Sequence, residues 1–205
     1  MIQPKLKRRF LAGAAALGVA VVTGCTHLQV AYLNSYDSIA FEPSGDDLLV
    51  SGTLNQFSLA SFEQAIAENP ETTRLVLMYV PGSVDDETNL KLGNRVRDLG
   101  LDTHLTADSE VHSGGTDLFL AGVERSMEEG AIIGVHSWAE GNRAGADFPK
   151  DDPVHESYVS YTARMLGSAD FYWFTLDAAP VEDTYIMTPA DIAKYGLLTK
   201  PVVKN

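Results

Sequence analysis

The chain has 205 residues, of which 45% are hydrophobic and 21% charged, and its formal net charge is −13 at pH 7. This length can bury a substantial core in one domain, which is what we expect here. The excess of acidic residues argues against nucleic acid and anionic lipid headgroups as partners, because binding to them requires a basic surface. We attribute the acidity to a solvated surface.

Residues 1–24 have the composition of an export signal peptide. Lys5, Lys7, Arg8 and Arg9 form a basic start, and the apolar run LAGAAALGVAVV follows. This run is too short for a comfortable membrane span. Removal of the segment would leave 11 Lys and Arg against 28 Asp and Glu, a net charge near −17.

Cys25, the only cysteine of the chain, ends the motif VTGC. This motif resembles the lipobox of bacterial lipoproteins, in which the signal is cleaved before the cysteine and the cysteine becomes lipidated. The resemblance implies attachment to the membrane through a lipid anchor only. Thr26 at the next position favours the periplasmic face of the outer membrane, by similarity to Gram-negative sorting patterns. The alternative is an ordinary thiol at the end of a signal anchor.

The rest of the chain alternates between strand and helix patterns. Residues 25–46 are polar with scattered aromatic residues and predict a tether, so that the domain would cover residues 47–205. Strands are expected at residues 48–54, 74–80, 101–107 and 131–138. Helices are expected at residues 58–69, 88–100, 114–130, 152–167, 168–176 and 188–196. The alternation favours an α/β fold with right-handed crossovers and a mostly parallel sheet flanked by helices.

Several helix ends carry capping signals. The first helix is expected to begin at Ser58 or Ser61, because serine is favoured as an N-cap. Gly100 should end the second helix, and the last should begin with Thr188 as N-cap and Pro189 at its first position.

Three loops should meet at the carboxyl edge of such a sheet, and they contain Gly82, Ser113 and His136. A serine hydroxyl becomes a nucleophile when a histidine accepts its proton and a carboxylate fixes the histidine tautomer. Backbone N–H groups near a helix start can hold the oxyanion that develops. The N–H groups of Gly82 and Gly114 are the candidates for this oxyanion hole.

Four motifs in order, VPGSV, SGGTDLFLAG, GVHSW and MTPADIAKYGLL, resemble those of the Clp protease proteolytic subunit and, more loosely, the Clp/crotonase superfamily. The resemblance covers about residues 47–198. It implies a repeated ββα superhelix and a serine peptidase or other acyl hydrolase without cofactor. It also implies a catalytic triad of Ser113, His136 and Asp177, with Asp183 as the alternative third member. The helix near residues 153–166 occupies the place of an oligomerising element, which implies a homo-oligomer.

Two alternatives are left open. In the first, the protein is a catalytically inactive binding or assembly module of the envelope, with Ser113 as a helix N-cap and His136 as a core histidine. In the second it is a crotonase-type acyl-thioester enzyme, although no basic residue near the site would bind a nucleotide phosphate. We expect no metal, and His112 should be structural. Three other histidines lack the mutual spacing of a metal site: His27, His104 and His155.

Overall fold

The structure is a computed structural model, and it describes residues 38–204. The predicted signal peptide, Cys25 and most of the predicted tether lie outside these residues. Within residues 38–204, no helix is long and apolar enough to cross a membrane.

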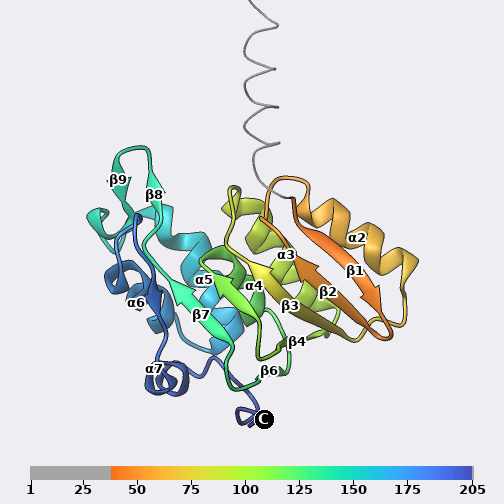
Figure 1. Ribbon diagram of the computed structural model, residues 1–205. Coiled ribbons are helices and arrows are strands. Elements are labelled where there is room, and N and C mark those ends of the chain that lie inside the picture. The colour runs from red at the N-terminus through yellow and green to blue at the C-terminus, as the bar shows by residue number, and fades with distance from the viewer. Residues whose placement is uncertain (1–37, 205) are drawn as a thin grey trace, which may run out of the picture. The chain divides into compact units, whose positions relative to one another are not determined.

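Strands and helices alternate along the described residues (Figure 1). The strands are β1 (Ala40–Ser44), β2 (Asp47–Ser51), β3 (Arg74–Val80), β4 (Asp102–Leu105), β5 (Glu110–His112), β6 (Arg125–Met127), β7 (Ile132–Val135), β8 (Ala139–Glu140), β9 (Arg143–Ala144) and β10 (Tyr185–Ile186). The α-helices are α2 (Ser58–Glu68), α3 (Asp86–Asp98), α4 (Gly114–Leu120), α5 (Glu156–Leu166), α6 (Asp170–Ala178) and α7 (Pro189–Lys194). Two short 3-10 helices are η1 (Gly145–Asp147) and η2 (Pro153–His155).

The main sheet is mostly parallel and divides in the middle of β3. Its strands follow the order β1-β2-β3-β5-β7-β10, and only the edge strands β1 and β10 pair antiparallel. The first half of β3, residues 74–76, pairs with β4, whereas Tyr79 and Val80 pair with β5. β4 in turn pairs with β6. Because of this division, the chain leaves β3 and β5 at the same edge of the sheet.

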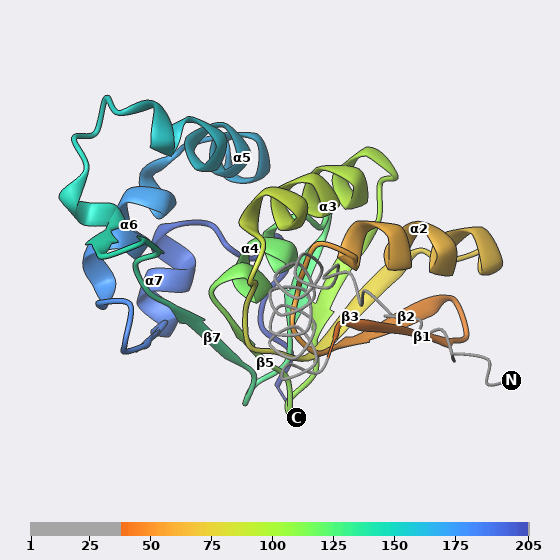
Figure 2. The same ribbon diagram turned by 90° about the horizontal axis from the view of Figure 1, so that it is seen from above.

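Helices pack against one face of this sheet, as α2, α3 and α4 show in Figure 2. Leu48 and Val50 of β2 and Leu75 and Leu77 of β3 alternate with less buried residues and are fully buried. They join Phe62 of α2 in one hydrophobic core. This burial confirms the α/β fold with a mostly parallel sheet that the sequence predicts.

The helix predicted at residues 114–130 was wrong in its second half. α4 ends at Leu120, and residues 125–127 form β6 instead. A side chain at Gly122 would lie 2.2 Å from Thr103 Oγ1 and 2.6 Å from Thr103 N, so the chain passes β4 too closely to continue as a helix. Pairing with β4 therefore overrides the helix propensity of this segment.

Other boundaries also differ from the expectations. Residues 40–44, which the sequence places in the tether, pair with β2 as β1. The N-cap of α2 is Phe57 and not Ser58 or Ser61. Ser58 is the first residue of the helix, and its Oγ accepts a hydrogen bond from Asn55 N in the preceding turn. β5 was not expected, and it is this strand, rather than residues 101–107, that leads into Ser113.

The end of α3 and the start of α7 agree more closely with the sequence. Gly100 follows α3 with φ +72°, which suits glycine after a helix end. Thr188 accepts a hydrogen bond from Asp191 N, and Pro189 takes the first helical position of α7.

The first turn of α4 lies against the end of β3 and has no room for a side chain there. A Cβ atom on Gly115 would lie 2.2 Å from the carbonyl oxygen of Val80. At the preceding position, a Cβ on Gly114 would lie 2.7 Å from Ser83 Cβ. These two glycines therefore set the distance between α4 and the loop that follows β3.

Gly115→Ala should lower the free energy of unfolding by about 3 kcal/mol, because the added methyl group overlaps backbone that cannot rotate away. Gly45→Ala is the control, since Gly45 has φ +64° and no atom within 4 Å of the added Cβ. That variant should lose only about 1 kcal/mol. Urea unfolding measures both. A more stable Gly115→Ala variant, as helix propensity alone would give, would contradict the close packing.

Candidate active site

Ser113 joins β5 to α4 in a strained conformation. Its φ of 50° and ψ of −122° make it the sole non-glycine residue with positive φ among residues 38–204. Strain of this kind costs on the order of 1–3 kcal/mol and is concentrated at functional sites. A serine at a strained strand-to-helix turn also presents its hydroxyl outward, as nucleophiles of hydrolases do.

The hydroxyl of Ser113 is not used to cap α4. Ser113 occupies the N-cap position, yet its side chain makes no capping hydrogen bond. Its backbone is held on both sides, because Ser113 N donates to Gly134 O at 3.0 Å and Asp117 N donates to Ser113 O at 3.1 Å. Asn89 Nδ2 also donates to Gly114 O at 2.9 Å. The surrounding structure thus fixes the turn without the hydroxyl.

The sheet register places His136 beside Ser113. His112 of β5 pairs with Gly134 of β7 in a parallel register. Ser113 is therefore opposite the residue just before His136 on the neighbouring strand. His136 Nδ1 lies 2.7 Å from Ser137 O. A carbonyl oxygen only accepts, so Nδ1 carries a proton and Nε2 is left as the acceptor. No hydrogen bond joins Ser113 and His136 in the described part of the chain.

Gly82 and Gly114, the two residues predicted to form an oxyanion hole, lie next to Ser113. Gly82 has φ +146°, and a Cβ built there would lie 3.4 Å from Ser113 Cβ. Its carbonyl accepts from Leu54 N at 3.0 Å, which anchors the loop. Among the described residues, neither the Gly82 N–H nor the Gly114 N–H has a hydrogen-bond partner. Both donors are therefore available to a ligand.

Ser113 and His136 line one small pocket of about 40 Å³. A water molecule requires at least about 10–15 Å³ measured in this way, so the pocket has room for only a few water-sized groups. The other lining residues are Asp86, Leu90, Thr116, Asp117, Val135, Trp138, Tyr158, Tyr161, Thr162, Phe171, Tyr172 and Thr175. A larger substrate must extend outward from this pocket.

The two aspartates predicted as third triad members lie elsewhere. Asp177 is exposed near the end of α6, and Asp183 is exposed and accepts a hydrogen bond from Thr184 N. Thr175, two residues before Asp177, lines the pocket. Residues two apart on an α-helix point roughly 200° apart, so the Asp177 side chain faces away from it. Neither aspartate contacts His136 in this structure.

Two other carboxyl groups, which sequence reasoning missed, do line the pocket. Asp86 accepts hydrogen bonds from Tyr158 OH at 2.8 Å and from Ser83 Oγ. Asp117 lies one helical turn after Ser113, and its carboxyl accepts no hydrogen bond from any described residue. Burial and the nearby charge of Asp86 raise the pKa of Asp117 to about 7. The spacing from Ser113 on α4 was the signal available in the sequence.

Stacked aromatic rings form another part of the pocket wall. The Tyr158 ring lies parallel to both Trp138 and Tyr172, with centroids 5.6 Å and 5.4 Å away. Trp138 Nε1 donates to Tyr172 OH at 3.0 Å, so the Tyr172 hydroxyl can donate its own proton to His155 Nδ1 at 2.6 Å. His155 is buried, and its Nε2 has no partner among the described residues. The wall is thereby held by a continuous polar chain.

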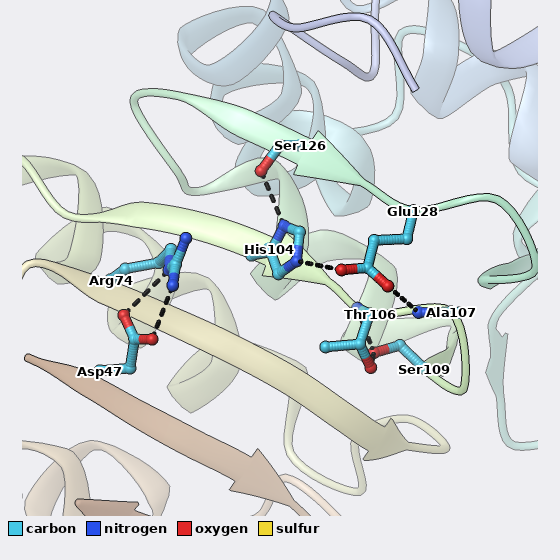
Figure 3. Close-up of polar contacts among 8 residues, drawn as sticks. All are labelled: Asp47, Arg74, His104, Thr106, Ala107, Ser109, Ser126 and Glu128. Carbon is cyan, nitrogen blue, oxygen red and sulfur yellow. Dashed lines mark hydrogen bonds and ion pairs between the residues drawn. The ribbon is translucent and has the colours of Figure 1, made fainter. Parts of the chain in front are cut away.

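A second serine and histidine pair lies outside the pocket, on β6 and β4 (Figure 3). Ser126 Oγ lies 2.8 Å from His104 Nδ1, and Glu128 Oε1 lies 3.7 Å from His104 Nε2. His104 and Ser126 are direct cross-strand partners, and Glu128 Oε2 also accepts from Ala107 N at 3.0 Å. These contacts tie two strands and a turn together, which is a structural role.

No protein-family model matches the chain, and no curated protein matches it in sequence. Solved structures match its fold. The 1510-N membrane-bound stomatin-specific protease, in a serine-to-alanine mutant, aligns with a TM-score of 0.51 and 14% identity over 77% of each chain.

Two enoyl-CoA hydratases align to a similar extent. That of Thermoplasma volcanium GSS1 has a TM-score of 0.52 and 14% identity over 78% of this chain and 70% of its own. That of Polaromonas sp. JS666 has a TM-score of 0.50 and 14% identity over 82% and 71%. Identities this low show the fold alone. The chain therefore has the α/β fold of ClpP-like and crotonase proteins.

Asp117→Asn should make folding less dependent on pH. The pKa of Asp117 is raised from its ordinary 3.8 to about 7 in the folded protein, so its contribution to stability is complete below pH 4 and is lost as the pH rises through 7. Relative to the wild type, the variant should therefore become more stable as the pH rises from 5 to 8. Its Tm should increase by about 2–4 °C for each kcal/mol of stability that the wild type loses over this range. Thermal unfolding at both pH values measures this.

Asp151→Asn is the matched control, because Asp151 is exposed and the substitution removes the same charge. Its Tm difference from the wild type should stay constant between pH 5 and pH 8. The same constant difference in Asp117→Asn would contradict the raised pKa.

Proposed function

We propose that the protein is a serine hydrolase that acts on a peptide or another acyl substrate, with Ser113 as nucleophile and His136 as general base. The strained turn at Ser113 carries the proposal. Its hydroxyl is free of capping, lines a pocket with His136 and has two unpaired N–H groups beside it. These are the parts that acyl transfer needs. The fold shared with ClpP-like proteins supports this reading.

The proposed reaction starts with the Ser113 hydroxyl and the substrate carbonyl. Ser113 Oγ bonds to the carbonyl carbon while its proton passes to His136 Nε2, and the N–H groups of Gly82 and Gly114 hold the oxyanion. Collapse breaks the bond to the leaving group, which takes the proton from His136. A water molecule, deprotonated by His136, then releases the acyl group and regenerates Ser113.

The third member of the triad has a different candidate from the one the sequence predicts. A carboxylate in this position fixes the histidine tautomer and stabilises the imidazolium. Ser137 O already fixes the tautomer through its 2.7 Å contact with His136 Nδ1. We propose that this carbonyl orients His136, while Asp177 and Asp183 remain predictions from the sequence alone.

The alternative function, an inactive binding or assembly module, also has an observation in its favour. No hydrogen bond joins Ser113 to His136 in the described residues, and the pocket is small. Catalytic hydrogen bonds are often long in ligand-free structures and shorten when substrate binds. The acyl-thioester alternative is less favoured, since the pocket lining contains no Lys or Arg to receive a phosphate.

Ser113→Ala should abolish covalent labelling by a fluorophosphonate probe, and His136→Ala should slow labelling by at least about 100-fold, because the probe needs an activated serine. Mass spectrometry of the labelled peptide identifies the site. Labelling that persists in Ser113→Ala would exclude Ser113 as nucleophile, and a wild type that never labels would favour the inactive module.

Asp177→Asn and Asp183→Asn separate the two proposals for the third member. If Ser137 O orients His136, each variant should label within about threefold of the wild type. Loss of a triad carboxylate costs on the order of 10⁴-fold, so a fall of that size in either variant would restore the aspartate to the triad.

We also propose that the protein is anchored in the bacterial cell envelope through a lipid on Cys25, which rests on the lipobox resemblance. Cys25→Ser should lose incorporation of labelled palmitate and move from the membrane fraction to the soluble fraction on cell fractionation. A variant that stays with the membrane would show that another segment holds it. Self-association through the α5 region is a further proposal, which analytical ultracentrifugation tests.

A further inference from the structure

The pocket beside Ser113 contains a carboxyl group without a hydrogen-bond partner among the described residues. Asp86 accepts one hydrogen bond at each carboxyl oxygen, from Tyr158 OH and from Ser83 Oγ. The Asp117 carboxyl lines the same pocket, and no described residue donates a hydrogen bond to it. A partly buried carboxyl without a donor is unfavourable, so a ligand that supplies a donor there gains affinity.

The remaining lining favours a cation as that donor. None of the lining residues is Lys or Arg, while two are carboxylic acids. Trp138, Tyr158 and Tyr172 line the same pocket, and aromatic rings attract cations. Carboxyl and aromatic groups together are the usual surroundings of a bound organic cation.

The size of the pocket selects among cations. A volume of about 40 Å³ accommodates only a few water-sized groups. A primary ammonium is compact and donates in three directions, whereas a guanidinium is a broad planar fork. The pocket therefore fits an ammonium at the end of an unbranched chain better than a guanidinium.

We propose that this pocket selects substrates that carry a primary ammonium close to the scissile acyl bond, as a lysine side chain does, and that Asp117 is the residue that binds the ammonium. The inference rests on the proposed hydrolase function for its link to catalysis. Binding of the ammonium itself does not require Ser113 to react.

The ionisation of Asp117 gives this selectivity a pH dependence. Burial and then Asp86 raise the pKa of Asp117 to about 7, and a bound ammonium would lower it again. Selectivity for the cation should therefore rise from pH 6 to pH 8. The titratable and charged groups around Asp117 are Asp86 of α3, His136 after β7, Tyr158 and Tyr161 of α5 and Tyr172 of α6, with Arg97 and Arg164 next to Tyr161.

His136, the proposed general base, lines the same pocket as Asp117. Burial raises the pKa of the three tyrosines, that of Tyr172 to about 12, so they stay neutral. The ratio of the two rates removes effects that are common to both probes, and the Asp117→Asn variant assigns the remaining selectivity to Asp117.

The test compares two peptidyl diphenyl phosphonates that differ only in a lysine or a norleucine side chain next to phosphorus. The wild type should be labelled at least about tenfold faster by the lysine probe at pH 8, and the ratio should fall toward pH 6. In Asp117→Asn the ratio should be near one at both pH values. Asp151→Asn, which removes an exposed charge, should keep the wild-type ratio.

A second measurement is independent of catalysis. Binding of n-butylammonium and of 1-butanol is followed by NMR titration of the wild type, Asp117→Asn and Asp151→Asn at pH 8. Binding of the ammonium alone, lost only in Asp117→Asn, supports the inference even if no probe labels Ser113. Equal rates with both phosphonates, or no preference for the ammonium over the alcohol, would overturn it. Labelling by both probes at equal rates would leave the hydrolase function intact.

Discussion

The close approach of α4 to the end of β3 is the constraint on which the site depends. Gly115 lies so near the Val80 carbonyl that no side chain fits between them. This contact holds the first turn of α4 against the loop containing Gly82, and Ser113 is the residue between β5 and that turn. The strain at Ser113 follows from fitting a strand and a helix start into this space, and the surrounding hydrogen bonds stabilise it.

The division of β3 explains why a site forms at this edge. Its first half pairs with β4, and its second half pairs with β5. The chain between β4 and β5 can therefore return to the same sheet and bring Ser113 beside the loop after β3. The parallel register of β5 with β7 then brings His136 to the same level. Three loops that are distant in sequence meet because of these pairings.

The electrostatics of the pocket differ from those of a simple serine and histidine site. Asp86 and Asp117 lie close enough for the charge of Asp86 to raise the pKa of Asp117. One carboxyl is stabilised by two hydroxyl groups and the other is not, so the two have different roles. Since the unsatisfied carboxyl belongs to the helix for which Ser113 is the N-cap, α4 would link substrate selection to catalysis in the function that we propose.

The sequence by itself determined the α/β alternation, the strand at residues 74–80, the capping of α7 and the order of Gly82, Ser113 and His136. These features depend on local hydropathy, on capping and on residues that mark turns, all of which are readable within a few positions. It also placed two glycines after Ser113, without showing that packing against β3 requires the second of them.

Only the tertiary structure decided which carboxyl groups face the site and where α4 ends. Asp177 lies in α6, about 200° around the helix from Thr175, which lines the pocket. Which face of α6 is buried depends on the elements that pack against it. Residues 125–127 have helix-forming side chains, yet they pair with β4 more than twenty residues earlier. Such outcomes depend on contacts between distant segments, which local patterns do not contain.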